Sequence, residues 1–188
     1  MRDAGSVRVR WTVAAIAAAV LALPRLLGAQ VPTQGIKVHG HWVIEVRDAD
    51  GTLRVRREFE NALQPEGRRV LAEVLSRTIP MGGWIIFAAG PGGNLCNALP
   101  VSNGCRMVEP GSIFPADSWT FKNLTKTVTD ASELVLQGSF VVGNSGSVIN
   151  VLTEISPPGS VFTFTSLPSP ILVEATQTVS VTVTISFS

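Results

Sequence analysis

The sequence is short of the residues from which much protein chemistry is built. Its 188 residues include no tyrosine, two histidines and two cysteines, and only 15% of them are charged. So few histidines and cysteines leave few ways to assemble a zinc site, a Ser-His-Asp triad or a Cys-His pair. With 15 basic and 14 acidic residues, the chain also lacks the basic field that suits binding to nucleic acid.

The first 29 residues have the pattern of a secretory signal peptide. Three arginines precede an apolar run over residues 11–23, and small residues lie just before Gln30. We expect cleavage after Ala29, with an uncleaved anchor as the alternative. Cleavage leaves residues 30–188 as one domain that is secreted, periplasmic or held at the cell surface, with no stable insertion in the membrane.

The two cysteines, Cys96 and Cys105, lie in a segment rich in Gly, Pro and Asn that covers residues 90–118. In an oxidising compartment such a pair closes a short loop, so we predict a disulfide that orders part of the segment. Long connections on a rigid sheet often bind ligands, which makes this segment the candidate binding loop. Its candidate contact residues are Asn94, Asn103, Phe114 and Trp119.

Apolar and polar residues alternate from Ile36 to Arg47, which predicts a β-strand with one dry face and one wet face. Turn residues at 48–51 and a second alternating segment at 52–61 predict a β-hairpin. Arg57 falls on the apolar side of the second strand. We therefore expect either a bulge or an edge position there.

His39 and His41 project from the wet face of the first strand, where Glu45 also lies. They are weak candidates for a metal site, because two ligands on a flat face do not enclose an ion. We interpret them as solvent-facing polar residues and predict neither a metal nor a cofactor.

One segment has the periodicity of a helix. Pro65 suits the first helical position, and an apolar stripe at Val70, Leu71, Val74 and Leu75 follows before Pro80 ends the pattern. A single helix of about 13 residues among strands must lay its stripe on a sheet or cap the opening of a sandwich.

The rest of the sequence predicts β structure. The apolar run at 84–90 indicates a strand buried on both sides, and residues 105–108 indicate a short strand. Pro168 is expected to separate the last two strands. Their Val, Ile, Thr and Phe content predicts an antiparallel β-sandwich, immunoglobulin-like or jelly-roll-like, with one packed α-helix. The remaining strands are expected at 119–128, 133–142, 147–155, 161–166 and 170–187.

The chain ends in a further alternating pattern, residues 177–188, with Val, Ile and Phe on one side and Ser and Thr on the other. Such a strand can pair within its own domain, exchange with a neighbouring copy, or close a small outer-membrane β-barrel. A barrel needs aromatic girdles, which a chain without tyrosine supplies poorly. We expect pairing within the domain, with self-association through this strand as the alternative.

Three motifs occur together in this chain: REFENAL at 57–63, a helix with Gly67, Leu71, Ala72 and Leu75, and the ending VTVTISFS at 181–188. In these segments it resembles a group of uncharacterised β-rich secreted or phage-particle-type structural proteins. The resemblance implies a particle, surface or appendage protein and brings no catalytic residues with it.

These observations favour an exported, non-enzymatic structural or binding module, such as a subunit of a filament or particle. Its expected ligand is a protein or a glycan. The carboxylates are scattered along the sequence, so no catalytic pair can be named. An extracellular hydrolase acting on a polymer is the enzymatic alternative, and a small outer-membrane β-barrel is the membrane alternative.

Overall fold

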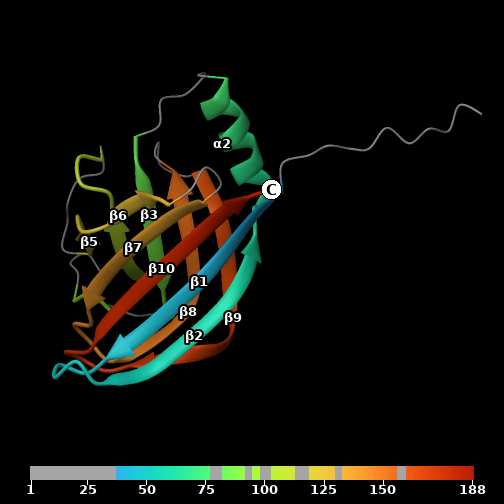
Figure 1. Cartoon of the computed structure of the whole chain (residues 1–188). Coiled ribbons are helices and arrows are strands. Elements are labelled where there is room, and N and C mark those ends of the chain that lie inside the picture. Colours follow the sequence, from blue (N-terminus) through green and yellow to red (C-terminus); the bar gives the residue numbers. More distant parts are fainter. Residues whose placement is uncertain are drawn as a thin grey trace, which may run out of the picture. The chain divides into compact units, whose positions relative to one another are not determined.

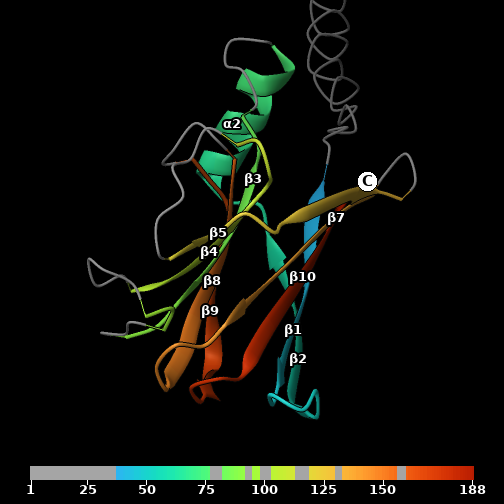
Figure 2. The same cartoon turned by 90° about the vertical axis from the view of Figure 1, so that its left-hand side faces the viewer.

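The computed structural model describes residues 37–76, 82–91, 95–97, 103–112, 119–129, 133–155 and 160–188. Within these residues the strands form two sheets, which Figure 2 shows as separate layers, and one helix lies at one end (Figure 1). The elements are β1 (Val38–Arg47), β2 (Leu53–Ala62), α2 (Pro65–Leu75), β3 (Trp84–Ala89), β4 (Gly104–Val108), β5 (Thr120–Phe121), β6 (Thr125–Val128), β7 (Glu133–Val141), β8 (Gly146–Ile155), β9 (Ser160–Val173) and β10 (Thr178–Phe187).

The first sheet has the strand order β2-β1-β10-β7-β6, with every neighbouring pair antiparallel. The C-terminal strand β10 lies at its centre and pairs with β1 and β7 of the same chain. Its alternation is that of a half-buried strand, because Val179, Val181, Val183 and Ile185 are buried while the residues between them are partly exposed. Exchange of this strand between copies stays a prediction.

The second sheet has the order β5-β4-β3-β8-β9. Its pairs are antiparallel except for β4 with the two-residue strand β5, which runs parallel. The layers meet through the apolar faces of both sheets, with Trp42 and Phe162 among the largest fully buried side chains. Gly138 on β7 allows close approach, because a Cβ there would lie 2.8 Å from the Cβ of Met107 on β4.

The prediction that Pro168 ends a strand is wrong. β9 extends from Ser160 to Val173 and contains both Pro168 and Pro170. It is an edge strand, and its pairing with β8 skips residues 167–170, so neither proline has to donate an N–H to the ladder. The turn comes later, at 174–177, where Thr176 takes a positive φ of 74°.

The single strand predicted at 119–128 is two short strands that belong to different sheets. β5 pairs with β4 in the second sheet, and β6 pairs with β7 in the first. Residues 122–124 carry the chain from one layer to the other, and Leu124 is buried between them. The sequence pattern does not reveal that the chain crosses between sheets here, because the alternation of side chains has the same two-residue period in either sheet.

The expected edge position of Arg57 is confirmed, because β2 is the outermost strand of the first sheet. Arg57 faces the same side as Phe59 but stays exposed. The bulge of this hairpin lies elsewhere: Val46 pairs with Val55 and Arg47 with Leu53, so that Arg54 is the extra residue.

The helix α2 packs on β9. Gly67 and Val70 are its buried residues, and the backbone N–H of Gln64, just before the helix, donates to the carbonyl of Phe162 at 3.1 Å. The predicted β-sandwich with one packed helix is thus confirmed. Of the helical segments in the described part of the chain, none has the length and apolarity needed to cross a membrane.

We expect Gly67→Ala to destabilise the domain. A Cβ at this position would collide with the carbonyl oxygen of Phe162 and lie 2.9 Å from its Cα. Alanine gains about 1 kcal/mol of helix propensity over glycine, yet a collision with backbone outweighs this, so unfolding in urea should show a net loss of about 1–2 kcal/mol.

The matched control for this variant is Arg68→Ala, at the next and exposed position of α2. It should change the free energy of unfolding by less than about 0.5 kcal/mol. An unchanged or increased stability of Gly67→Ala would show that the helix does not lie this close to β9.

Candidate functional site

A row of large side chains crosses the outer face of the second sheet. Arg106 on β4 pairs with Phe87 on β3, Phe87 pairs with Leu152 on β8, and Leu152 pairs with Phe164 on β9. Because residues that pair across strands point to the same side, these four side chains form one line. The residues next to them in each strand, such as Met107 and Ala88, belong to the inter-sheet core.

Trp119 extends this row at its β4 end. Its carbonyl accepts a hydrogen bond of 2.9 Å from the backbone N–H of Arg106. The guanidinium carbon of Arg106 lies 4.3 Å from the centroid of the Trp119 ring and 5.3 Å from that of Phe87. Both distances are in the range of cation–π attraction, so the two rings hold the cation in place. We call Trp119, Arg106, Phe87, Leu152 and Phe164 the aromatic row.

The aromatic row reaches solvent. Phe164 is 39% exposed, and the other four residues are half-buried. An apolar stripe with a fixed cation on a sheet face is more than the scattered exposed hydrophobics that any protein surface carries. It therefore has the composition of the central part of a binding surface.

One carboxyl group is buried beside the row. Glu154 on β8 pairs with Ile85 on β3, which pairs with Val108 on β4, so its immediate neighbours on this face are apolar. Glu154 is only 8% exposed. Burial raises the pKa of its carboxyl above the ordinary value, and the positive charge of Arg106 partly offsets this rise.

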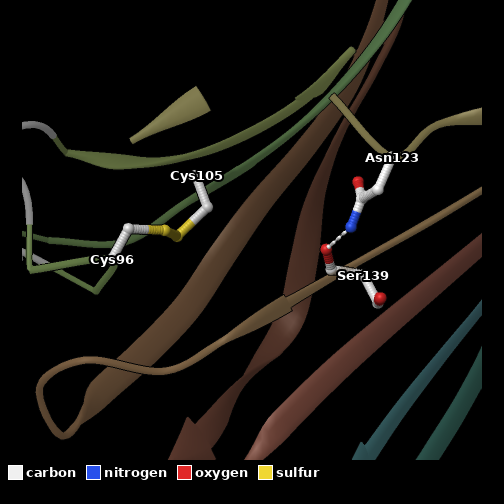
Figure 3. Close-up of a disulfide and its surroundings, with 4 residues drawn as sticks. All are labelled: Cys96, Cys105, Asn123 and Ser139. Carbon is white, nitrogen blue, oxygen red and sulfur yellow. Dashed lines mark hydrogen bonds between the residues drawn. A yellow bond between two sulfur atoms is a disulfide. The ribbon is translucent and has the colours of Figure 1, made fainter. Parts of the chain in front are cut away.

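Cys96 and Cys105 lie at disulfide distance, with Cα atoms 5.8 Å apart, and form a disulfide (Figure 3). Cys105 is on β4, directly before Arg106, and is fully buried. The bridge ties the turn at 95–97 to this strand and contributes on the order of 2–3 kcal/mol by loop closure. It thereby supports the strand that carries the cation of the aromatic row.

The structure separates the four predicted contact residues of the loop. Trp119 belongs to the aromatic row, whereas Asn103 is exposed just before β4 and its carbonyl accepts a hydrogen bond of 2.7 Å from the backbone N–H of Gly90. Asn94 and Phe114 lie outside the described residues. The predicted loop thus contributes one end of the candidate site.

Sequence reasoning missed Arg106, Phe87, Leu152 and Phe164. The run at 84–90 predicts a strand buried on both faces, but Phe87 is only half-buried. Phe164 lies two residues after the buried Phe162, so alternation alone would place both on the core side. It faces outward because the pairing of β9 with β8 shifts at Phe162, which the sequence pattern does not signal. Strand order, which the sequence does not reveal, decides which of these residues meet.

The two histidines project from the outer face of β1. His39 is exposed, and Nδ1 of His41 lies 2.7 Å from Oε1 of Glu60. Glu45, the third residue considered for a metal, contacts Arg47 and Arg56 instead. Over the described part of the chain, no three His, Cys, Asp or Glu side chains come together in a group that could hold a metal ion.

A polar hollow of about 340 Å³ lies on the outer face of the first sheet. The side-chain amide of Asn123 borders it and donates to the carbonyl of Ser139 at 2.5 Å (Figure 3). None of its described lining residues is ionisable. Its lining residues are Asn123, Thr125, Gln137, Gly138, Ser139, Ser180, Val181 and Thr182.

No protein-family model, no curated protein and no solved structure matches this chain. The resemblance to particle-type proteins therefore stays a prediction. The function has to be inferred from the geometry of the aromatic row and its neighbours.

We expect Glu154 to make stability depend on pH. The folded protein binds this proton more tightly than the unfolded chain, so the stabilisation is complete below the ordinary pKa near 4.5 and is lost as the pH rises through the raised value. Relative to wild type, Glu154→Gln should gain free energy of unfolding from about pH 4 to about pH 8, measured by urea denaturation at each pH.

Other carboxylates titrate in both proteins and cancel in this difference. A difference between Glu154→Gln and wild type that stays constant over the range would show that Glu154 titrates as a solvated carboxyl.

Proposed function

We propose that this chain is an exported, non-enzymatic binding or structural module that docks on a partner protein through the aromatic row. The observation that carries the proposal is the register of the second sheet, which aligns Arg106, Phe87, Leu152 and Phe164 across four adjacent strands. Trp and Arg are enriched among the residues that contribute most to protein–protein binding. A flat row on a rigid sheet suits another protein surface better than a small molecule, which is usually enclosed.

The arrangement of Arg106 supports a role in recognition. Its guanidinium is held by Trp119 and Phe87, so it loses little freedom when a partner binds. A cation within an apolar stripe adds electrostatic complementarity to a partner surface, which contributes to specificity more than to affinity. The disulfide at Cys105 adds rigidity to the same strand.

Export is supported by two features of the chain. The first 29 residues have the order of a signal peptide, with basic residues, an apolar run and small residues in sequence. Disulfides persist in oxidising compartments, which agrees with the bridge between Cys96 and Cys105. We therefore propose that the domain acts in the periplasm, at the cell surface or outside the cell.

Among the described residues, Glu154 is a carboxyl group whose pKa is raised by burial, as a general acid requires. Glycoside hydrolysis uses two carboxyl groups that face each other across the bond to be cleaved. The charged neighbour that shifts the pKa of Glu154 is Arg106, a cation. This arrangement favours binding over hydrolysis.

Site-specific photo-crosslinking in the producing cells tests the proposal. A photoreactive benzoylphenylalanine in place of Phe164 should join the protein to a discrete partner band. The matched control places the same group at Val141, which is 58% exposed on the first sheet and should give no such band. Equal crosslinking at both positions, or none at Phe164, would contradict the proposal.

Once the partner is identified by mass spectrometry, Arg106→Ala should weaken its binding at least tenfold, about the effect of removing a central contact residue. Val141→Ala should leave the dissociation constant unchanged. Equal weakening by both variants would place the interface elsewhere.

A further inference from the structure

Within the part of the chain that the structure describes, β2 is the outermost strand of the first sheet and one of its long edges is open. Within the described residues β2 pairs with β1 on one side, and on the other side a strand contact appears only at its end, where Leu63 bridges to Thr163 of β9. The stretch Leu53–Glu60 therefore presents backbone donors and acceptors along a free edge. Such an edge is a template for a further strand.

Charge is distributed along β2 in two halves. Arg54, Arg56 and Arg57 occupy its first half, and Glu58 and Glu60 occupy its second. In an antiparallel pair the first half of one strand faces the second half of the other. From this pattern we infer that two copies of the chain pair antiparallel along β2, about a two-fold axis at Arg57.

The two-fold arrangement places opposite charges side by side. Arg56 of each copy comes opposite Glu58 of the other, so the axis generates this pair twice. Shifting the register by two residues would instead oppose two copies of Glu58 or two copies of Arg56 on the outer face. In the inferred register the outer face holds only opposite charges, and the one like-charged pair, Arg57 with Arg57, lies on the core side of the strand.

The core side of β2 is complementary as well. Val55 comes opposite Phe59 of the second copy, and both residues are only half-buried in the single chain. Phe59 stacks on Trp42 with ring centroids 6.0 Å apart, so it is held in place to receive the second copy. Pairing would cover the apolar surface that an edge strand leaves open.

Three features keep this contact weak. The two Arg57 side chains meet at the axis, and an inward charge on an edge strand opposes strand addition. Arg56 already forms ion pairs with Glu45 and Glu58 of its own chain, and the bulge at Arg54 shortens the regular edge. A short edge buries less area than a permanent interface, so the expected product is a reversible dimer.

The inference is independent of the aromatic row, which lies on the other sheet. A dimer paired along β2 would join the first sheets of two copies into one continuous sheet. The partner of this edge is thus a second copy of the chain, and the two copies form a closed dimer with two-fold symmetry.

Sedimentation equilibrium of the full exported chain tests the inference. Wild type should be a monomer–dimer mixture with a dissociation constant between about 10 µM and about 1 mM. Arg56→Glu should raise this constant about tenfold, because both symmetry-related pairs become like-charged. The combined variant Arg56→Glu with Glu58→Arg should return it to within about threefold of wild type, because the exchanged charges pair again.

Two further variants make the result specific. Arg68→Glu changes the charge equally on the exposed face of α2 and should leave the dissociation constant unchanged. Arg57→Thr should strengthen the dimer, since it removes the repulsion at the axis. Thermal unfolding of each variant checks that the domain is intact.

The inference would be overturned by a wild-type chain that stays monomeric up to millimolar concentration. It would also be overturned if the combined charge exchange failed to restore association in a folded domain, or if Arg68→Glu weakened the dimer as much as Arg56→Glu.

Discussion

The packing of β10 at the centre of the first sheet is the constraint on which the fold depends. Val179, Val181, Val183 and Ile185 are buried against the facing layer, and each contributes about 1.5–3 kcal/mol when removed from water. The backbone of this strand pairs with β1 and with β7, which are far from it and from each other in the sequence. The first sheet is therefore complete only when the end of the chain has joined it, as in other folds dominated by long-range contacts.

The alternation that fills the core also builds the candidate site. On β4, Met107 points between the layers and its neighbour Arg106 points outward, while Ala88 and Phe87 divide in the same way on β3. A slip of one residue would turn the cation toward the core and the apolar side chain toward solvent. Packing of the core thus determines the register of the second sheet, and this register aligns the side chains of the aromatic row.

The edge strands of the two sheets differ in length and in proline content, and these differences determine which edge can pair with another strand. β9 carries Pro168 and Pro170, and β5 and β6 are short, so these edges accept further strands poorly. β2 is long and carries charges of both signs in separate halves. Its edge therefore differs from the others in being complementary to a second copy of itself.

Local sequence patterns were enough to predict the alternating strands, the first hairpin, the start of the helix at Pro65 and the partner of Cys96, because each depends on close neighbours or on a single available cysteine. The extension of β9 past Pro168, the division of 119–128 between two sheets and the contact of Trp119 with Arg106 depend on tertiary packing. Strand order follows from burial between distant segments, whereas alternating apolar and polar residues look the same whichever strand lies beside them.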